Sequence, residues 1–184
     1  MNEVGLRLLE DDDYEFLQCM FLETIFWRAD RPRRSFENVM SEPSLAKYLL
    51  GWGRPGDSGV VALSEADERV GIAWYRVFSE EDQGYGFVSR DIPELGIATT
   101  ADYRGRGIGL ILMRGLIQLA RSEGRAGLSL SVEVDNRRAL DLYRRLGFRQ
   151  VATIGNSWTM LLTLDPAAST ERGSPSRGSG SITK

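Results

Sequence analysis

The sequence predicts one α/β (α+β) domain in which about four helices flank a seven-stranded sheet. Two strand–turn–helix units, near residues 94–120 and 128–146, carry most of this prediction. The composition agrees, because 42% hydrophobic and 27% charged residues are typical of a globular protein. A chain of 184 residues is long enough to bury one core of this size.

The individual elements follow from apolar periodicity and from the residues that bound each segment. Strands are expected over 4–9, 60–64, 70–78, 94–99, 128–134, 148–154 and 158–164. Helices are expected over 14–28, 45–52, 108–120 and 136–146. Asp11-Asp12-Asp13 supplies a cap and negative charge for the first helix. Residues 1–165 therefore form the domain, and the tail 166–184, rich in Ser, Gly, Pro and Arg, is expected to be disordered.

The turn Arg104-Gly105-Arg106-Gly107-Ile108-Gly109 joins a buried strand to a helix. Such a turn leaves backbone N–H groups without partners at the positive end of the helix dipole, which favours a phosphate or pyrophosphate. Its three glycines remove side chains where a ligand would approach the backbone. The alternative is an ordinary tight turn between a strand and a helix.

Two common phosphate-binding motifs are excluded. A dinucleotide-binding fingerprint needs glycine at position 110, which is Leu, and a P-loop needs Gly-Lys-Ser/Thr, which is absent. The pattern that matches is Arg/Gln-x-x-Gly-x-Gly/Ala, with Arg104, Gly107 and Gly109. It resembles the acyl-CoA pyrophosphate loop of the GNAT family, the Gcn5-related N-acetyltransferases.

A second segment strengthens the resemblance. Residues 136–148 read Asn-x-x-Ala-x-x-Leu-Tyr-x-x-x-Gly-Phe, which is similar to the second CoA-binding motif of GNAT enzymes. One helix, one turn and one strand separate the two motifs, as the family requires. The motif resemblance covers Glu94 to Phe148, whereas before residue 60 it rests on element order alone.

The resemblance implies a mixed, mostly antiparallel sheet that splays between the strands at 95–99 and 128–134. The acyl-pantetheine arm of acetyl-CoA would lie in this gap, paired with the backbone of Ile97 and Thr99 like an added strand. The residues implied in CoA binding are Ile97, Ala98, Thr99, Arg104, Gly105, Arg106, Gly107, Ile108, Gly109, Leu110, Asn136 and Tyr143.

The resemblance also implies two proton-handling groups. Tyr143 lies at the family's acid position, and an ordinary tyrosine pKa of about 10 suits donation to a departing thiolate. Its alternative role is to orient CoA. Glu94 is the candidate base, since an alkylamine must lose a proton before it attacks. Glu133 competes for this role, and solvent would replace a dedicated base.

Other observations narrow the class of protein. The chain has no histidine and a single cysteine, Cys19, so no metal is expected and the thiol is expected in the core. A net charge of -3 argues against nucleic acid, and the basic run Arg28, Arg31, Arg33 and Arg34 is expected to be a solvated loop, an ion-pairing segment or a contact for the CoA 3′-phosphate. Without an apolar span or signal peptide, a cytoplasmic protein with no membrane partner is expected; a homodimer stays open.

The sequence therefore predicts an N-acetyltransferase that moves an acetyl group from acetyl-CoA to a primary amine by direct attack in a ternary complex. Metabolites, antibiotics, polyamines and peptide amines all remain candidate acceptors. One alternative is a non-catalytic acyl-CoA-binding sensor or regulatory protein. The other is transfer of a longer acyl group.

Overall fold

The computed structural model describes residues 4–164, and its elements alternate in the order expected for the two strand–turn–helix units. The strands are β1 (Gly5–Leu8), β2 (Ser58–Leu63), β3 (Arg69–Arg76), β4 (Glu94–Thr99), β5 (Gly127–Glu133), β6 (Arg149–Ile154) and β7 (Ser157–Thr163). The α-helices are α1 (Tyr14–Ile25), α2 (Phe36–Met40), α3 (Pro43–Ala46), α4 (Ile108–Ser122) and α5 (Arg137–Arg145). Short 3-10 turns cover Asp11–Asp13 and Ala101–Tyr103.

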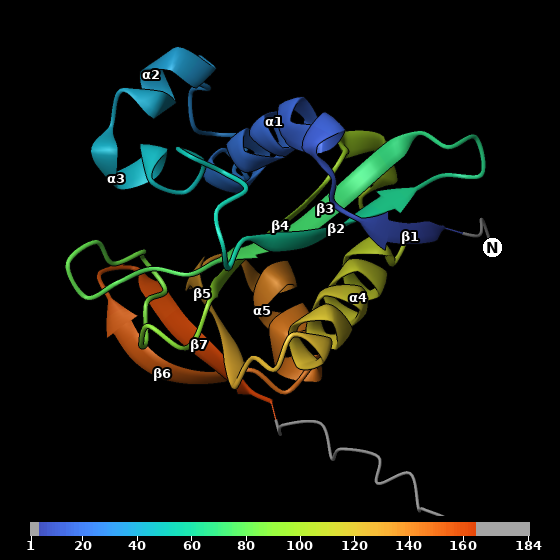
Figure 1. The fold of residues 1–184 in the computed structure, drawn as a ribbon. Coiled ribbons are helices and arrows are strands. Elements are labelled where there is room, and N and C mark those ends of the chain that lie inside the picture. The colour runs from blue at the N-terminus through green and yellow to red at the C-terminus, as the bar shows by residue number, and fades with distance from the viewer. Residues whose placement is uncertain (1–3, 165–184) are drawn as a thin grey trace, which may run out of the picture.

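The seven strands form one sheet in the order β1-β2-β3-β4-β5-β7-β6. Every neighbouring pair is antiparallel except β4 and β5, which are parallel and share a single register pair, Glu94 with Ser129. There the Ser129 N–H donates to the Pro93 carbonyl at 2.9 Å. Beyond this point the two strands separate, and Figure 1 shows them diverging between the two halves of the sheet. The predicted splay is therefore present.

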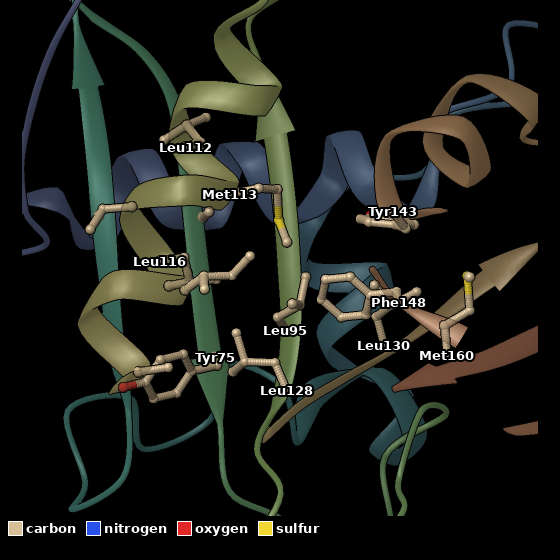
Figure 2. Close-up of a cluster of buried hydrophobic side chains, with 14 of the residues drawn as sticks. Tyr75, Leu95, Leu112, Met113, Leu116, Leu128, Leu130, Tyr143, Phe148 and Met160 are labelled. Atoms are coloured by element: carbon tan, nitrogen blue, oxygen red, sulfur yellow. The ribbon is translucent and has the colours of Figure 1, made fainter. Parts of the chain in front are cut away.

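Helices cover both faces of the sheet. In Figure 1, α1 lies across one face, and α4 and α5 lie on the other. The apolar face of α4 enters the larger of two buried clusters, which also contains Leu130, Met160 and Tyr143. Figure 2 shows Tyr143 and Phe148 on the side of this cluster away from Leu112 and Leu116. The smaller cluster lies between α1 and the other face.

The predicted strands are confirmed to within two residues at most ends, but the region between residues 32 and 52 differs. It contains two short helices, α2 and α3, so the helices number five within residues 4–164. Ser35 caps α2 by accepting from the Asn38 N–H, and Pro43 occupies the first turn of α3, where its missing N–H costs nothing. The predicted tail lies outside the described residues.

Two expectations for the first helix were wrong. Cys19 is exposed, because the 3.6-residue period turns Leu17, Met20 and Phe21 toward the sheet instead. Asp13 makes no side-chain cap for α1 itself, although it accepts from the Glu10 N–H at 3.0 Å in the capping box of the preceding 3-10 turn. Its buried carboxylate also accepts hydrogen bonds from Arg7 at 2.5 and 2.8 Å, which holds the pKa of Asp13 below its usual value.

A buried ion pair anchors the segment that follows α3. The Arg76 guanidinium donates to the two carboxylate oxygens of Asp57 at 2.9 and 2.6 Å, and both side chains are 1% exposed. It also donates to the carbonyls of Lys47 and Leu50. The pair therefore fastens residues 47–57 to the central strand β3, close to the start of β4.

Asp57→Ala is expected to destabilise the fold strongly, because it leaves the Arg76 charge buried without a counter-ion. We expect a loss of about 3–5 kcal/mol in the free energy of unfolding, measured by urea titration. Asp82→Ala is the control, since its pair with Lys47 is largely exposed on the aspartate side and contributes about 1 kcal/mol or less. Equal losses in the two variants would contradict a special role for the buried pair.

Candidate active site

The gap between β4 and β5 exposes backbone groups of β4. The Thr100 N–H donates to the Val70 carbonyl of the β3 side at 3.0 Å, and the Ala98 carbonyl approaches Gly71 of β3. Because successive residues of a strand point their backbone groups in opposite directions, those of Ile97 and Thr99 face away from β3, toward the gap. This is the orientation that an added extended chain requires.

The glycine-rich turn lies at the end of this gap, before α4. Gly105 and Gly107 have φ of +83° and +86°, a left-handed conformation that strains any residue with a side chain. Within residues 4–164, the amides of residues 105–109 donate to no acceptor, and the first helical bond returns from Leu110 to the Gly107 carbonyl at 3.0 Å. A run of unpaired donors at a helix N-terminus is the arrangement that binds an anion.

The surroundings of the turn have room for such a group. A Cβ added at Gly107 would meet no atom within 4 Å, and one added at Gly105 would lie 3.5 Å from Arg138 Nη2. Arg138 is exposed on the first turn of α5 and adds positive charge beside the turn. The open cradle, the free amides and this guanidinium together fit the pyrophosphate of an acyl-CoA.

The two arginines of the turn have other partners. Arg104 donates to Glu23 of α1 at 2.5 Å, and Arg33 shares the same carboxylate. The Arg106 guanidinium lies over the Tyr103 ring, 4.9 Å from its centroid. The backbone, rather than these side chains, therefore presents the free donors.

The basic run after α1 forms ion pairs, as one of its expected roles requires. Arg28 binds Asp135 at 3.1 Å, and Arg31 binds both carboxylate oxygens of Glu133 at 2.8 and 2.9 Å. Arg33 and Arg34 pair with carboxylates of their own neighbourhood. These contacts tie the loop after α1 to the end of β5. They also occupy Glu133, the competitor of Glu94.

Asn136 is the N-cap of α5. Its side-chain oxygen accepts from the Ala139 N–H at 3.2 Å, which satisfies one of the free donors of the first turn. The amide nitrogen of the side chain makes no hydrogen bond within residues 4–164, so it is free to donate. Asn136, which the resemblance implies in CoA binding, therefore both orders the start of α5 and keeps a donor for a ligand.

Glu94 lies at the point where β4 and β5 begin to separate, and it is 6% exposed. Pro93 and the start of β4 thus place this carboxyl inside the molecule. Its Oε1 accepts a hydrogen bond from the Tyr48 hydroxyl at 2.8 Å. Its Oε2 accepts none from the described residues.

The surroundings of Glu94 change its acidity. Burial raises the pKa of this carboxyl to about 7, and the hydrogen bond from Tyr48 opposes part of the rise. A carboxyl with a pKa near 7 exchanges a proton readily at neutral pH, which is what a general base needs. Buried carboxyls with such a pKa concentrate at functional sites.

Tyr143 is 7% exposed and packs against Phe148, with ring centroids 5.7 Å apart. Its hydroxyl has no hydrogen-bond partner within residues 4–164, and burial raises its pKa. The phenol therefore keeps its proton at neutral pH. Tyr143 packs in the buried cluster on the α4 side of the sheet, whereas Glu94 contacts Tyr48, which packs against the cluster on the α1 side.

Sequence reasoning missed two residues of this region. Tyr48 follows α3 in a segment without a motif, and no periodicity marks it as a partner of a residue 46 positions away. Arg138 lies inside the second motif, at one of its unspecified positions. Its place in the first turn of the helix predicted after the second strand was the available signal.

The family match agrees with this geometry. Residues 16–148 match the acetyltransferase (GNAT) family model, and the chain belongs to this family. Members of the family use acetyl-CoA as the acetyl donor. One solved relative, a protein of Salmonella typhimurium with acetyl-CoA, covers 93% of this chain and 99% of its own, with a TM-score of 0.63 and 21% identity. A putative acetyltransferase of Acinetobacter baylyi gives a TM-score of 0.66 at 21% identity, over 90% and 95% of the two chains.

Curated relatives are more similar in sequence but match over shorter stretches. An acetyltransferase of Pseudomonas aeruginosa for L-methionine sulfoximine and L-methionine sulfone is 32% identical over 63% of this chain and 70% of its own length. A mycothiol acetyltransferase of Propionibacterium freudenreichii is 33% identical over 81% of this chain but 45% of its own. The match to an uncharacterized N-acetyltransferase of Methanocaldococcus jannaschii spans 27% of that relative. The chain thus spans less than half the length of several curated relatives.

No helix in residues 4–164, the described part of the chain, is long and apolar enough to cross a bilayer. No group of three or more His, Cys, Asp or Glu side chains in the same part is placed to hold a metal ion.

Proposed function

We propose that this protein transfers the acetyl group of acetyl-CoA to a primary amine, by direct attack of the amine in a ternary complex. The observation that carries the proposal is Glu94, a 6% exposed carboxyl that binds the Tyr48 hydroxyl at the point where β4 and β5 separate. Burial raises its pKa to about 7, which suits a group that takes a proton from an amine at neutral pH. Acetyl-CoA supplies an acyl thioester whose carbonyl carbon accepts the amine.

Different groups of the chain bind different parts of acetyl-CoA. The amides of residues 105–109 and the guanidinium of Arg138 hold the pyrophosphate. The backbone of Ile97 and Thr99 pairs with the pantetheine arm, and the side-chain amide of Asn136 donates to it. These contacts place the reacting groups between β4 and β5.

Two protons move during the transfer. The carboxylate of Glu94 takes a proton from the ammonium form of the acceptor, directly or through a water molecule, which frees the nitrogen lone pair. As the new C–N bond forms and the C–S bond breaks, the Tyr143 hydroxyl gives its proton to the departing sulfur. As the amide forms, its nitrogen loses a second proton to solvent, which restores the phenol, and Glu94 releases the first proton to solvent before the next turnover.

The proposal is tested by calorimetric titration with acetyl-CoA, followed by a thiol-release screen over amino acids, polyamines, aminoglycosides and peptides. Micromolar binding with turnover on one class of amine would support the proposal and name the acceptor. Binding without turnover on any amine would favour an acyl-CoA sensor. Parallel assays with longer acyl-CoA donors decide the acyl group, and absence of binding would overturn the proposal.

Tyr143→Phe is expected to lower kcat by about a hundredfold while the affinity for acetyl-CoA stays within about twofold, because the ring remains and only the acidic proton is lost. Steady-state kinetics and calorimetry on the same preparation measure the two effects. Tyr103→Phe is the control, since that ring lies under Arg106 outside the predicted acid position. Turnover of Tyr143→Phe equal to that of the unmodified protein would remove Tyr143 from the acid role.

A further inference from the structure

The Tyr48 hydroxyl connects three separate segments. It donates to Glu94 Oε1 at 2.8 Å and accepts from the Tyr85 N–H at 2.6 Å. Tyr48 follows α3, Glu94 begins β4, and Tyr85 belongs to the connection between β3 and β4. One phenol oxygen therefore holds both the candidate base and the loop that covers it.

We propose that Tyr48 is a positioning residue for acetyl transfer: its hydroxyl holds the Glu94 carboxylate through a hydrogen bond to Oε1. This inference rests on the proposed function, and it adds a residue to it. Within residues 4–164, Oε2 has no hydrogen-bond partner and is covered by the loop at Gly84.

Packing makes the position of Tyr48 specific. Its ring stacks on Phe21 and Tyr85, with centroids 5.9 and 6.1 Å away, and meets the edge of Phe78 at 5.0 Å. Because these aromatic side chains pack on three sides of the Tyr48 ring, they fix the direction in which its hydroxyl points. The Glu94 carboxylate is thus oriented by a rigid aromatic group rather than by a mobile chain.

Within residues 4–164, no cation competes with Tyr48 for Glu94. Lys47 adds a weak favourable charge, but its ammonium binds Asp82 at 3.1 Å and the Gln83 carbonyl. Arg76 is the cross-strand neighbour of Glu94, yet its guanidinium is fully engaged by Asp57 and two carbonyls. The hydroxyl of Tyr48 is therefore the main specific partner of the carboxylate.

The covering loop fits this pair closely. A Cβ at Gly84 would lie 2.0 Å from Glu94 Oε2 and 2.9 Å from the Tyr48 hydroxyl. The backbone at Gly86 packs directly against Leu130 and Ser131 of β5. Only glycine allows the loop this approach, so residue 84 offers a way to disturb the pair without removing either of its members.

Tyr48→Phe tests the proposal because it removes the hydroxyl and keeps the ring. A hydrogen bond to a charged group favours the ionised form, so its loss raises the pKa of Glu94 above its value of about 7. We expect a rise of about one to two pH units in the acidic limb of the pH profile of kcat, and about a fivefold or greater loss of turnover at pH 7. The KM for acetyl-CoA should be unchanged.

The matched control is Tyr14→Phe. Tyr14 packs on the same buried cluster and donates a long hydrogen bond of 3.4 Å to the Leu49 carbonyl, so its loss should leave the pH profile in place. Gly84→Ala is the second variant. It is expected to shift the acidic limb of the pH profile of kcat in the same direction as Tyr48→Phe. Thermal unfolding of each variant shows that it folds.

A second readout does not require turnover. In protein labelled with 13C at the glutamate carboxyl carbons, the signal lost in Glu94→Gln identifies Glu94, and its pH titration is followed in each variant by NMR. A titration midpoint that rises in Tyr48→Phe but not in Tyr14→Phe supports the proposal, even if the amine screen finds no acceptor. An unchanged midpoint together with an unchanged limb overturns it, whereas absence of turnover in the unmodified protein counts against the proposed function alone.

Discussion

Replacing Glu94 by Gln should lower kcat by about 10²- to 10⁴-fold while acetyl-CoA binds as before. The amide has nearly the shape of the carboxyl and still accepts the Tyr48 hydrogen bond, but it takes no proton at neutral pH. Rates are measured by thiol release and affinity by calorimetry. In the unmodified protein kcat should rise with pH through about 7. In the variant kcat should show no such rise.

The substitution Glu94→Gln lowers kcat, but it should raise the stability of the folded protein at alkaline pH. The pKa of Glu94 is about 7 in the folded state, above its ordinary value of 4.5. The protonated carboxyl therefore contributes its full stability below pH 4.5, and this contribution is lost as the pH rises through about 7. At pH 8 the buried carboxylate therefore costs the folded state on the order of 3 kcal/mol. Glu94→Gln should be more resistant to urea than the unmodified protein at pH 8, but not at pH 4.

Glu133→Gln separates the two candidate bases. Glu133 lies at the end of the neighbouring strand, and its carboxylate is held by Arg31. Its replacement should change kcat by no more than a few-fold. A large loss of turnover in Glu133→Gln, with normal rates in Glu94→Gln, would transfer the role of base to Glu133. Small losses in both variants would assign proton removal to solvent.

Gly107→Glu should abolish measurable binding of acetyl-CoA, a loss of more than about a hundredfold in affinity. The site at Gly107 is open, so the new carboxylate can lie among the free amides and repel the pyrophosphate. The left-handed φ of Gly107 also disfavours any side chain. Calorimetric titration with acetyl-CoA measures the effect.

The control for this strain is Gly124→Glu at the opposite end of α4. Gly124 has φ of +71° and, like Gly107, no atom within 4 Å of an added Cβ, so both variants carry the same charge and a similar backbone penalty. Gly124→Glu should therefore lose stability but bind acetyl-CoA normally. Normal binding by Gly107→Glu would show that the turn does not hold the phosphates.

The parts of the fold that the sequence predicted well are those governed by local rules. The apolar face of α4 and the glycine-rich turn that precedes it follow from neighbouring residues. The parts that it predicted poorly depend on distant contacts. Cys19 was misplaced because one helix turn holds both inward and outward apolar positions, and α2 and α3 are too short for a clear period.

The candidate site divides in the same way. The residues of the glycine-rich turn are consecutive in the chain, so the turn can be recognised as a sequence motif. The burial of Glu94 depends on Tyr48 and on the loop at Gly84, which the fold brings from 46 and 10 positions away. No local sequence pattern predicts that these three segments come into contact. Sequence reasoning could name Glu94 as a candidate, but its burial and raised pKa appear only in three dimensions.

The single register pair between β4 and β5 gives this sheet two edges in its interior. An open strand edge is a template for any passing chain and a cause of aggregation. Here the two edges face each other in the interior of the sheet, with α1 on one face and α4 and α5 on the other (Figure 1), rather than at the outer rim. The fold thus keeps unpaired strand hydrogen-bonding groups away from the rim, where strands of separate molecules pair.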